Sequence, residues 1–236
     1  MRNALTSRAA RAIAGVAIGA GVLASGLAAP ASAVEPSSRS YTSIFTGPDA
    51  TFAGAGWATC PTPITWDADV STLSRQEARA QIANLRWALE EWGDASGLSF
   101  TYSGTSELVF DDASFALRDN TAVRSSERHI SFAFIPAQES RRLTRTVVGL
   151  GSPSSVWPGR NEITSGAAVF SSDYISRASR REARALLLHE IGHVLGLGHT
   201  DDPDQVMHAQ VHTGASLGAG DVEGVRNLVK TCTAGA

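Results

Sequence analysis

The chain has 236 residues, with 20 lysines and arginines against 23 aspartates and glutamates, and a formal net charge of −3 at pH 7. This acidic balance argues against a nucleic acid or an anionic membrane as partner, because such partners select a basic face. The length suits one domain that buries a full hydrophobic core.

Residues 1–33 have the pattern of a secretory signal peptide. An apolar, Ala/Gly-rich stretch runs to about residue 29 and is followed by the small-x-small pattern Ala31-Ser32-Ala33. The start is positive through three arginines: Arg2, Arg8 and Arg11. A membrane anchor is the alternative, but the stretch is short and broken by glycines. We therefore expect a secreted, extracellular protein with no membrane contact after removal of the signal.

Residues 34–55 are rich in Ser, Thr, Gly, Pro and Ala, which predicts a flexible N-terminal segment or a short propeptide. Residues 56–236 then form one predicted domain of mixed α and β structure. Its first strand starts at Ile64, and its first helix runs from Ser74 to about Trp92, with apolar residues at steps of three and four. Gly93 and Gly97 mark the end of that helix.

Short strands are expected over 98–102, 107–110 and 130–135. A further strand is expected over 162–170, after a glycine-rich approach at 149–151 and Gly159. A second helix begins near Ser176 or Ser179 and continues to about Leu195. The last helix begins at Asp221 as N-cap, with four apolar residues on one face: Val222, Val225, Leu228 and Val229.

Two cysteines, Cys60 and Cys232, are the whole cysteine content of the chain. Export into an oxidising compartment favours pairing them in a disulfide. Such a bond would tie the start of the domain to its end and close a very long loop, which favours stability in the chain-entropy model.

The chemistry is carried by the run from His189 to His199. His189 and His193 are four residues apart on a helix, so both rings project from one face toward one metal ion. Gly196 lets the chain leave the helix with a positive φ, and the turn returns His199 as a third ligand. Three neutral imidazoles leave the fourth position of zinc open, which is typical of a catalytic site. Glu190 is the expected general base and acid.

This run has two simpler interpretations. The histidines could merely cap and pack a helix, or the site could bind zinc without activity. The presence of Glu190 argues against the second, because a binding site has no need of a base beside its first ligand.

The run resembles the extended metzincin motif H-E-x-x-H-x-x-G-x-x-H at every fixed position. Met207 follows at the spacing of the methionine turn of the matrixin branch, although a core methionine is the alternative. Thr200 after the third histidine is also similar to matrixins, and Ala209 stands where astacins and serralysins have a zinc-binding tyrosine. The resemblance, to a bacterial secreted type, covers roughly residues 57–230.

The resemblance implies an α+β, zincin-like fold: a twisted, mixed five-stranded sheet with two long helices, and a small C-terminal subdomain with a third helix. In that fold an antiparallel edge strand lies above the cleft, and residues 162–170 are expected to form it. The subdomain after Gly196 would hold His199, Met207 and the last helix. A peptide substrate would bind to the edge strand as an added strand.

Departures from vertebrate matrixins limit what can be carried over. Ala209 replaces a proline that shapes the specificity pocket. Residues 146–162 contain no histidine, so one catalytic zinc is expected and no structural zinc. Calcium remains open through Asp111, Asp112 or Asp119, with a solvated turn as the alternative. The surroundings of Cys60 do not match the propeptide cysteine motif of matrixins, which again favours the disulfide.

The remaining polar residues have simpler interpretations. His129 is expected to be structural. His208 and His212 follow the methionine turn and either line the cleft or lie on the surface. A short basic run is expected on a solvated loop, with a contact to an acidic substrate residue as the alternative: Arg141, Arg142 and Arg145.

The sequence therefore predicts a monomeric, secreted zinc endopeptidase that acts on protein or peptide substrates. Two alternatives stay open: a non-catalytic zinc-containing binding protein, and a zinc peptidase of narrow specificity for cell-wall peptides.

Overall fold

The computed structural model describes residues 41–46, 52–114, 116–119, 128–157, 159–213 and 216–232. Its centre is a five-stranded sheet in the order β4-β3-β7-β9-β8. The neighbouring pairs β4–β3, β3–β7 and β7–β9 are parallel, and β8 is antiparallel to β9. The strands are β3 (Ile64–Asp69), β4 (Phe100–Thr105), β7 (His129–Ile135), β8 (Gly149–Trp157) and β9 (Glu162–Ser171).

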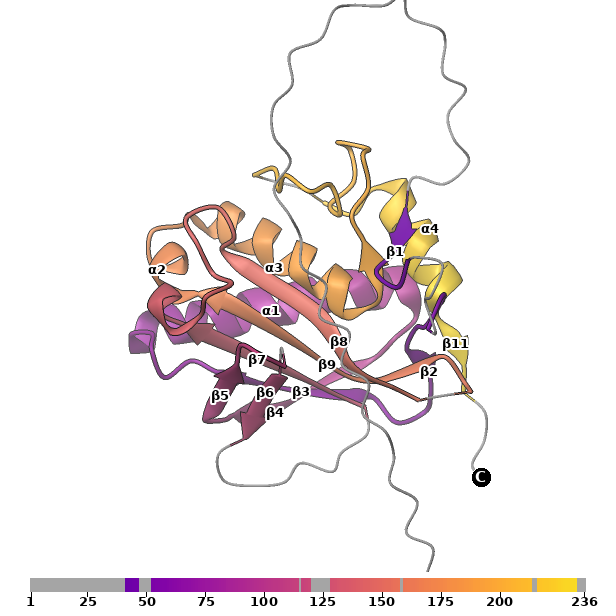
Figure 1. Cartoon of the computed structure of the whole chain (residues 1–236), viewed down its shortest axis with the longest axis horizontal. Coiled ribbons are helices and arrows are strands. Elements are labelled where there is room, and N and C mark those ends of the chain that lie inside the picture. The colour runs from indigo at the N-terminus through magenta and orange to yellow at the C-terminus, as the bar shows by residue number, and fades with distance from the viewer. Residues whose placement is uncertain are drawn as a thin grey trace, which may run out of the picture.

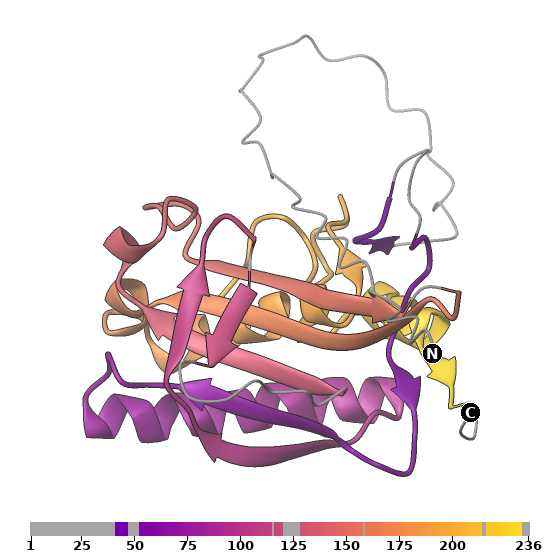
Figure 2. The ribbon, with the colours of Figure 1, turned by 60° about the horizontal axis from the view of Figure 1, so that its bottom comes forward.

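Two long helices, α1 (Arg75–Ser96) and α3 (Arg180–Val194), pack against one face of this sheet (Figure 1). A hairpin of β5 (Leu108–Asp111) and β6 (Ala116–Asp119) lies on the other face (Figure 2). The third helix of the predicted subdomain is α4 (Ala219–Leu228). The short elements are β1 (Thr42–Ser43), β2 (Ala58–Thr59), the 3₁₀ turn Ala137–Glu139, α2 (Ser172–Ile175), β10 (Leu197–Gly198) and β11 (Lys230–Thr231).

Alternation along β7 explains how the sheet is covered on both sides. Ile130, Phe132 and Phe134 are fully buried and belong to the main core under the helices. Ala133 and Ile135 point the other way, into a smaller apolar cluster with Leu108 of the hairpin. Parallel strands need cover on both faces, and this nearly continuous apolar run is what such strands require.

Local sequence signals set the ends of the two long helices. Ser74 and Ser179 each accept a hydrogen bond from the backbone N–H three residues on, at Glu77 and Glu182. The two glutamates bond back to the N-cap N–H groups, which completes a capping box at each helix. The predicted starts are thus confirmed, and α1 extends past Trp92 as far as Gly97, its C-cap.

The prediction that residues 162–170 form the edge strand is wrong. Strand β9 lies inside the sheet, between β7 and β8, and the antiparallel edge is β8. The glycine-rich stretch at 149–151, predicted as the approach to β9, is the start of β8. A Cβ atom on Gly151 would lie 2.1 Å from the carbonyl oxygen of Glu190, so this strand has glycine because it passes directly over α3.

The last helix also begins earlier than predicted. Its N-cap is Gly218, and Asp221 stands three positions on. The carboxylate of Asp221 accepts a hydrogen bond from the N–H of Gly218 at 2.8 Å, so the side chain caps the helix from inside its first turn.

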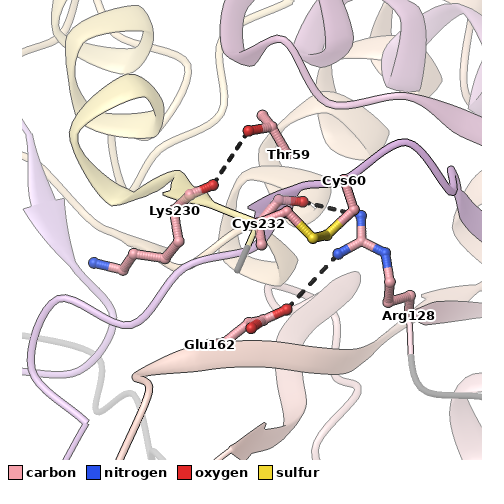
Figure 3. The surroundings of a disulfide bond; sticks show 7 residues. Thr59, Cys60, Arg128, Glu162, Lys230 and Cys232 are labelled. Atoms are coloured by element: carbon pink, nitrogen blue, oxygen red, sulfur yellow. Dashed lines mark hydrogen bonds and ion pairs between the residues drawn. A yellow bond between two sulfur atoms is a disulfide. The ribbon is translucent and has the colours of Figure 1, made fainter. Parts of the chain in front are cut away.

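The two ends of the domain are joined, as the cysteine content predicts. Cys60 and Cys232 form a disulfide that spans 172 residues of sequence, and β2 pairs in parallel with β11 beside it (Figure 3). Arg128 lies next to the bond, where it donates to the carbonyl of Ala58 at 2.9 Å and faces Glu162 at 3.8 Å. The disulfide thus closes a region that is already held by backbone and ionic contacts.

The predicted signal peptide lies outside the described residues. Within the predicted N-terminal segment, residues 41–46 and 52–55 are described, and Thr42–Ser43 forms β1, a strand that composition did not indicate. In the part of the chain that the structure describes, no helix combines the length and the apolar character needed to cross a bilayer.

Candidate metal centre

The side chains of His189, His193 and His199 converge, as their spacing predicts, and we call them the histidine cluster. The Nε2 atoms of each pair lie 3.2 Å apart. His189 and His193 are buried on α3, and His199 follows β10 on the returning chain. Among the described residues, no other group of three or more His, Cys, Asp or Glu side chains is placed to share a metal ion.

The hydrogen bonds of the outer ring nitrogens determine whether the inner nitrogens of His189 and His193 carry a proton. His189 Nδ1 is 2.7 Å from the carbonyl oxygen of Val206, and His193 Nδ1 is 2.8 Å from that of Leu197. A carbonyl only accepts, so both Nδ1 atoms carry the proton and both neutral rings present a lone pair at Nε2. Two facing lone pairs at 3.2 Å repel each other and do not form a hydrogen bond. A shared cation removes this conflict.

Zinc fits the dimensions of the cluster. Tetrahedral zinc with nitrogen ligands at its usual bond length separates those nitrogens by about 3.3 Å. The observed separation of 3.2 Å is within that geometry. The backbone carbonyls on the outer nitrogens fix ring orientation and tautomer, as partners of metal-bound imidazoles commonly do.

Burial tunes the protonation of the cluster toward metal binding. It lowers the pKa of His189 to about 4, although the hydrogen bond to Val206 acts in the opposite direction. Burial also lowers the pKa of His193 well below its usual value and lowers that of His199. Neutral imidazole is the form that binds a metal, so the rings need lose no proton near neutral pH.

The side chain of Glu190 extends from α3 toward the edge strand β8, and 6% of the residue's surface is exposed. A Cβ atom on Gly149 would lie 2.9 Å from its carboxyl oxygen, which shows how closely β8 covers it. Burial raises the pKa of Glu190 to about 8, and a hydrogen bond from the backbone of Gly151 partly offsets the rise. A divalent cation in the cluster would lower this pKa again, because it stabilises the carboxylate.

Met207 is buried next to α3, with 1% of its surface exposed. A Cβ atom on Gly192 would lie 2.3 Å from its sulfur, so the methionine packs against the helix turn between the first two histidines. Gly196 has φ 105°, the positive value that the return of the chain requires. The Thr200 N–H then donates to the Met207 carbonyl at 3.1 Å, which links the third-ligand segment to the methionine turn.

The other predicted residues lie outside the cluster. His129 is buried on β7, where it contacts Asp67 at 2.9 Å and Thr65 at 2.8 Å, a structural setting as expected. The rings of His208 and His212 stack with centroids 5.6 Å apart. His208 pairs with Thr200, the residue after His199, in an isolated parallel β-bridge, so its backbone lies next to the segment of the third histidine.

The aspartates considered for calcium are engaged by protein donors. Asp111 accepts from Ser114 and Arg118, and Asp112 accepts from Ser140 and the backbone N–H of Arg141. The side chain of Asp119 lies outside the described residues. Arg142 donates to the carbonyl of Asp112, so part of the basic run braces this loop.

Sequence reasoning missed the supporting role of Asp221, which it took only as a helix cap. The Asp221 carboxylate accepts hydrogen bonds from Val206 at 2.6 Å, Met207 at 3.2 Å and Gly218 at 2.8 Å. It therefore holds the methionine turn and, through the carbonyl of Val206, the ring of His189. A carboxylate followed by a predicted helix gave no signal of this long-range contact.

Three histidines around one point, with a buried glutamate next to the first of them, are an arrangement typical of zinc hydrolases. A sequence profile described as Matrixin matches residues 57–230, so the chain belongs to the matrixin family. It is therefore a zinc metalloendopeptidase, and the matching family implies a catalytic zinc for which the histidine cluster offers the site. A comparison with curated proteins gives no match.

Proposed function

We propose that this protein is a secreted endopeptidase whose single catalytic zinc is bound by His189, His193 and His199, with Glu190 as general base and acid. The observation that carries the proposal is the convergence of three imidazole Nε2 atoms, 3.2 Å apart, next to a buried carboxyl group. The disulfide supports the extracellular location, because such bonds persist in oxidising compartments.

His189, His193 and His199 would hold the zinc, which when bound would supply Lewis-acid chemistry toward water and the scissile carbonyl. Glu190 takes the proton from the attacking water and delivers it to the leaving amine. Its burial suits this task, because a carboxyl group shielded from water holds a transferred proton more readily than a solvated one does. Val206 and Leu197 keep two of the imidazoles in the tautomer that leaves Nε2 free.

Strand β8 is the proposed docking edge for the substrate. It is last in the sheet order, and only its β9 side is paired within the described sheet. A peptide in extended conformation could add to the free side by backbone hydrogen bonds. Glu190 lies directly below the first residues of β8, so a peptide paired there would have its backbone close to the proposed base.

The test compares Glu190→Gln with the unchanged protein. We expect the variant to keep one zinc per chain and to lose at least about 100-fold in kcat/KM, the scale of a lost general base. Glu223→Gln, on the exposed face of α4, is the matched control and should retain full activity. A Glu190→Gln enzyme that cleaves peptides at the normal rate would overturn the assignment of the base.

A peptide library derived from a proteome, digested with and without a zinc chelator, tests the reaction class. Chelator-sensitive cleavage inside the peptides supports an endopeptidase and yields its subsite preferences. A zinc-loaded protein that cleaves nothing in the library would favour a narrow specificity or a binding role.

A further inference from the structure

An N-terminal segment lies across the loop that carries the third histidine. We call residues 41–45 the N-terminal strap. Its strand β1 pairs antiparallel with β10, with Thr42 opposite Gly198 and Ser43 opposite Leu197. The N–H of Ile44 donates to the carbonyl of Gly196 at 2.8 Å. Figure 1 shows β1 next to α4, a helix near the other end of the chain.

Two contacts connect the strap to the proposed zinc ligands. The hydroxyl of Thr42 donates to the carbonyl oxygen of His199 at 2.5 Å. Ser43 pairs with Leu197, whose own carbonyl accepts the hydrogen bond from the His193 ring. The strap is therefore hydrogen-bonded to the main chain of His199, and it is paired with Leu197, the residue that orients the ring of His193.

The strap packs so closely on β10 and α4 that a side chain larger than that of glycine does not fit at two positions. A Cβ atom on Gly198 would lie 2.6 Å from the Thr42 hydroxyl oxygen. A Cβ atom on Gly224 of α4 would lie 2.7 Å from the ring of Tyr41. The Tyr41 hydroxyl also accepts a hydrogen bond from Asn227 at 3.0 Å. The strap thus joins α4 to β10, and the His199 segment lies between anchored elements.

We propose that the N-terminal strap is a positioning element of the metal centre, which slows the release of zinc by fixing His199 and, through Leu197, His193. The proposal rests on the zinc site proposed above. The helix positions His189 and His193 by its own geometry, but His199 lies beyond Gly196, where the backbone has left the helix. Contacts from outside the loop must restrain that ligand, and the strap supplies three hydrogen-bonded or paired positions along it: Gly196, Leu197–Gly198 and His199.

The experiment measures the rate of zinc release from the full secreted chain into excess EDTA, followed by a chromophoric zinc indicator. Thr42→Val keeps the shape of the side chain and removes the hydroxyl donor. Ile44→Pro removes the N–H that binds Gly196. Tyr41→Phe is the matched control, because it removes a hydroxyl that binds α4 and leaves the contacts to β10 intact.

We expect Thr42→Val to release zinc about fivefold faster, the effect of one hydrogen bond of ordinary strength. Ile44→Pro should release it about tenfold faster or more, and Tyr41→Phe should stay within about twofold of the unchanged protein. Denaturant midpoints of the metal-free proteins provide the second readout. Similar midpoints for Thr42→Val and Tyr41→Phe, with different zinc release, would separate positioning from a general loss of stability.

Unchanged zinc release in both Thr42→Val and Ile44→Pro would overturn the proposal. Equal acceleration in all three variants, with equally lowered metal-free midpoints, would also overturn it, because the strap would then be only a structural brace. The unchanged protein separates the two hypotheses. If it binds no zinc, the proposed function fails, whereas zinc binding that strap variants do not alter leaves that function intact.

Discussion

Replacing Asp221 with asparagine tests whether α4 holds the methionine turn. Asp221 has 1% of its surface exposed and accepts three backbone N–H groups, from Val206, Met207 and Gly218. The N–H groups of Val206 and Gly218 share one carboxylate oxygen, and that of Met207 binds the other. Asparagine can keep the shared oxygen, but it turns its amide NH₂ toward the N–H of Met207, donor against donor.

The cost follows from these contacts. One charge-assisted hydrogen bond is lost and one buried N–H is left without an acceptor, and relief of the buried charge offsets part of this. Burial raises the pKa of Asp221 despite its three hydrogen bonds, which indicates that the fold disfavours the charged carboxylate and that a neutral side chain avoids this penalty. We expect a loss of about 3 kcal/mol in the free energy of unfolding. For a domain of this size that lowers Tm by about 6–12 °C.

Urea unfolding of the metal-free protein measures this loss, and Glu223→Gln on the exposed face of α4 is the control, with an expected change within about 0.5 kcal/mol. Zinc release should also be faster in Asp221→Asn, because Val206 orients His189. A decrease below about 1 kcal/mol at unchanged m-value would refute the reasoning, since it would mean that the turn keeps its place without the carboxylate.

Three further predictions concern the rest of the domain. Changing both Cys60 and Cys232 to serine should destabilise the protein by up to about 5 kcal/mol, the chain-entropy value for a 172-residue separation, and an unchanged urea midpoint would exclude this. Gly192→Ala should cost about 1–3 kcal/mol, because the new Cβ would lie 2.3 Å from the sulfur of Met207, and a neutral calorimetric result would contradict that packing. The metal-free protein should lose stability as pH falls from about 6.5 toward 4, because the unfolded chain protonates histidines that stay neutral in the fold. Glu190 binds one more proton in the folded chain than in the unfolded chain, and so it opposes this loss. The net difference is about one proton, so the free energy of unfolding should fall by roughly 1.4 kcal/mol per pH unit. This fall should be steeper in Glu190→Gln.

The metal centre was predictable because its geometry is local. A four-residue spacing places His189 and His193 on one face of a helix, and Gly196 permits the turn that returns His199. The positions of these residues depend only on the helix period and on the backbone freedom of glycine. The capped starts of α1 and α3 were predictable for the same reason, since each capping box is contained in four consecutive residues.

The edge strand was misassigned because its sequence reflects a distant contact. Strand β8 begins with glycines, which favour loops by composition, but Gly151 is needed to clear the backbone of α3 at Glu190. Periodicity could not distinguish the two interpretations, since small side chains leave no alternation to read. The resemblance supplied an edge strand, and the more regular segment 162–170 was wrongly given that place.

Two different means hold the three histidines in place. Helix α3 positions two of them through its regular backbone, with burial keeping both rings neutral. The third lies on irregular chain, and the contacts that restrain it come from far away in sequence: the Thr42 hydroxyl is 157 residues from His199. The Asp221 carboxylate restrains the adjoining methionine turn in the same way. Beyond the end of α3, long-range hydrogen bonds therefore restrain the third histidine and the methionine turn, and zinc retention should depend strongly on substitutions at these contacts.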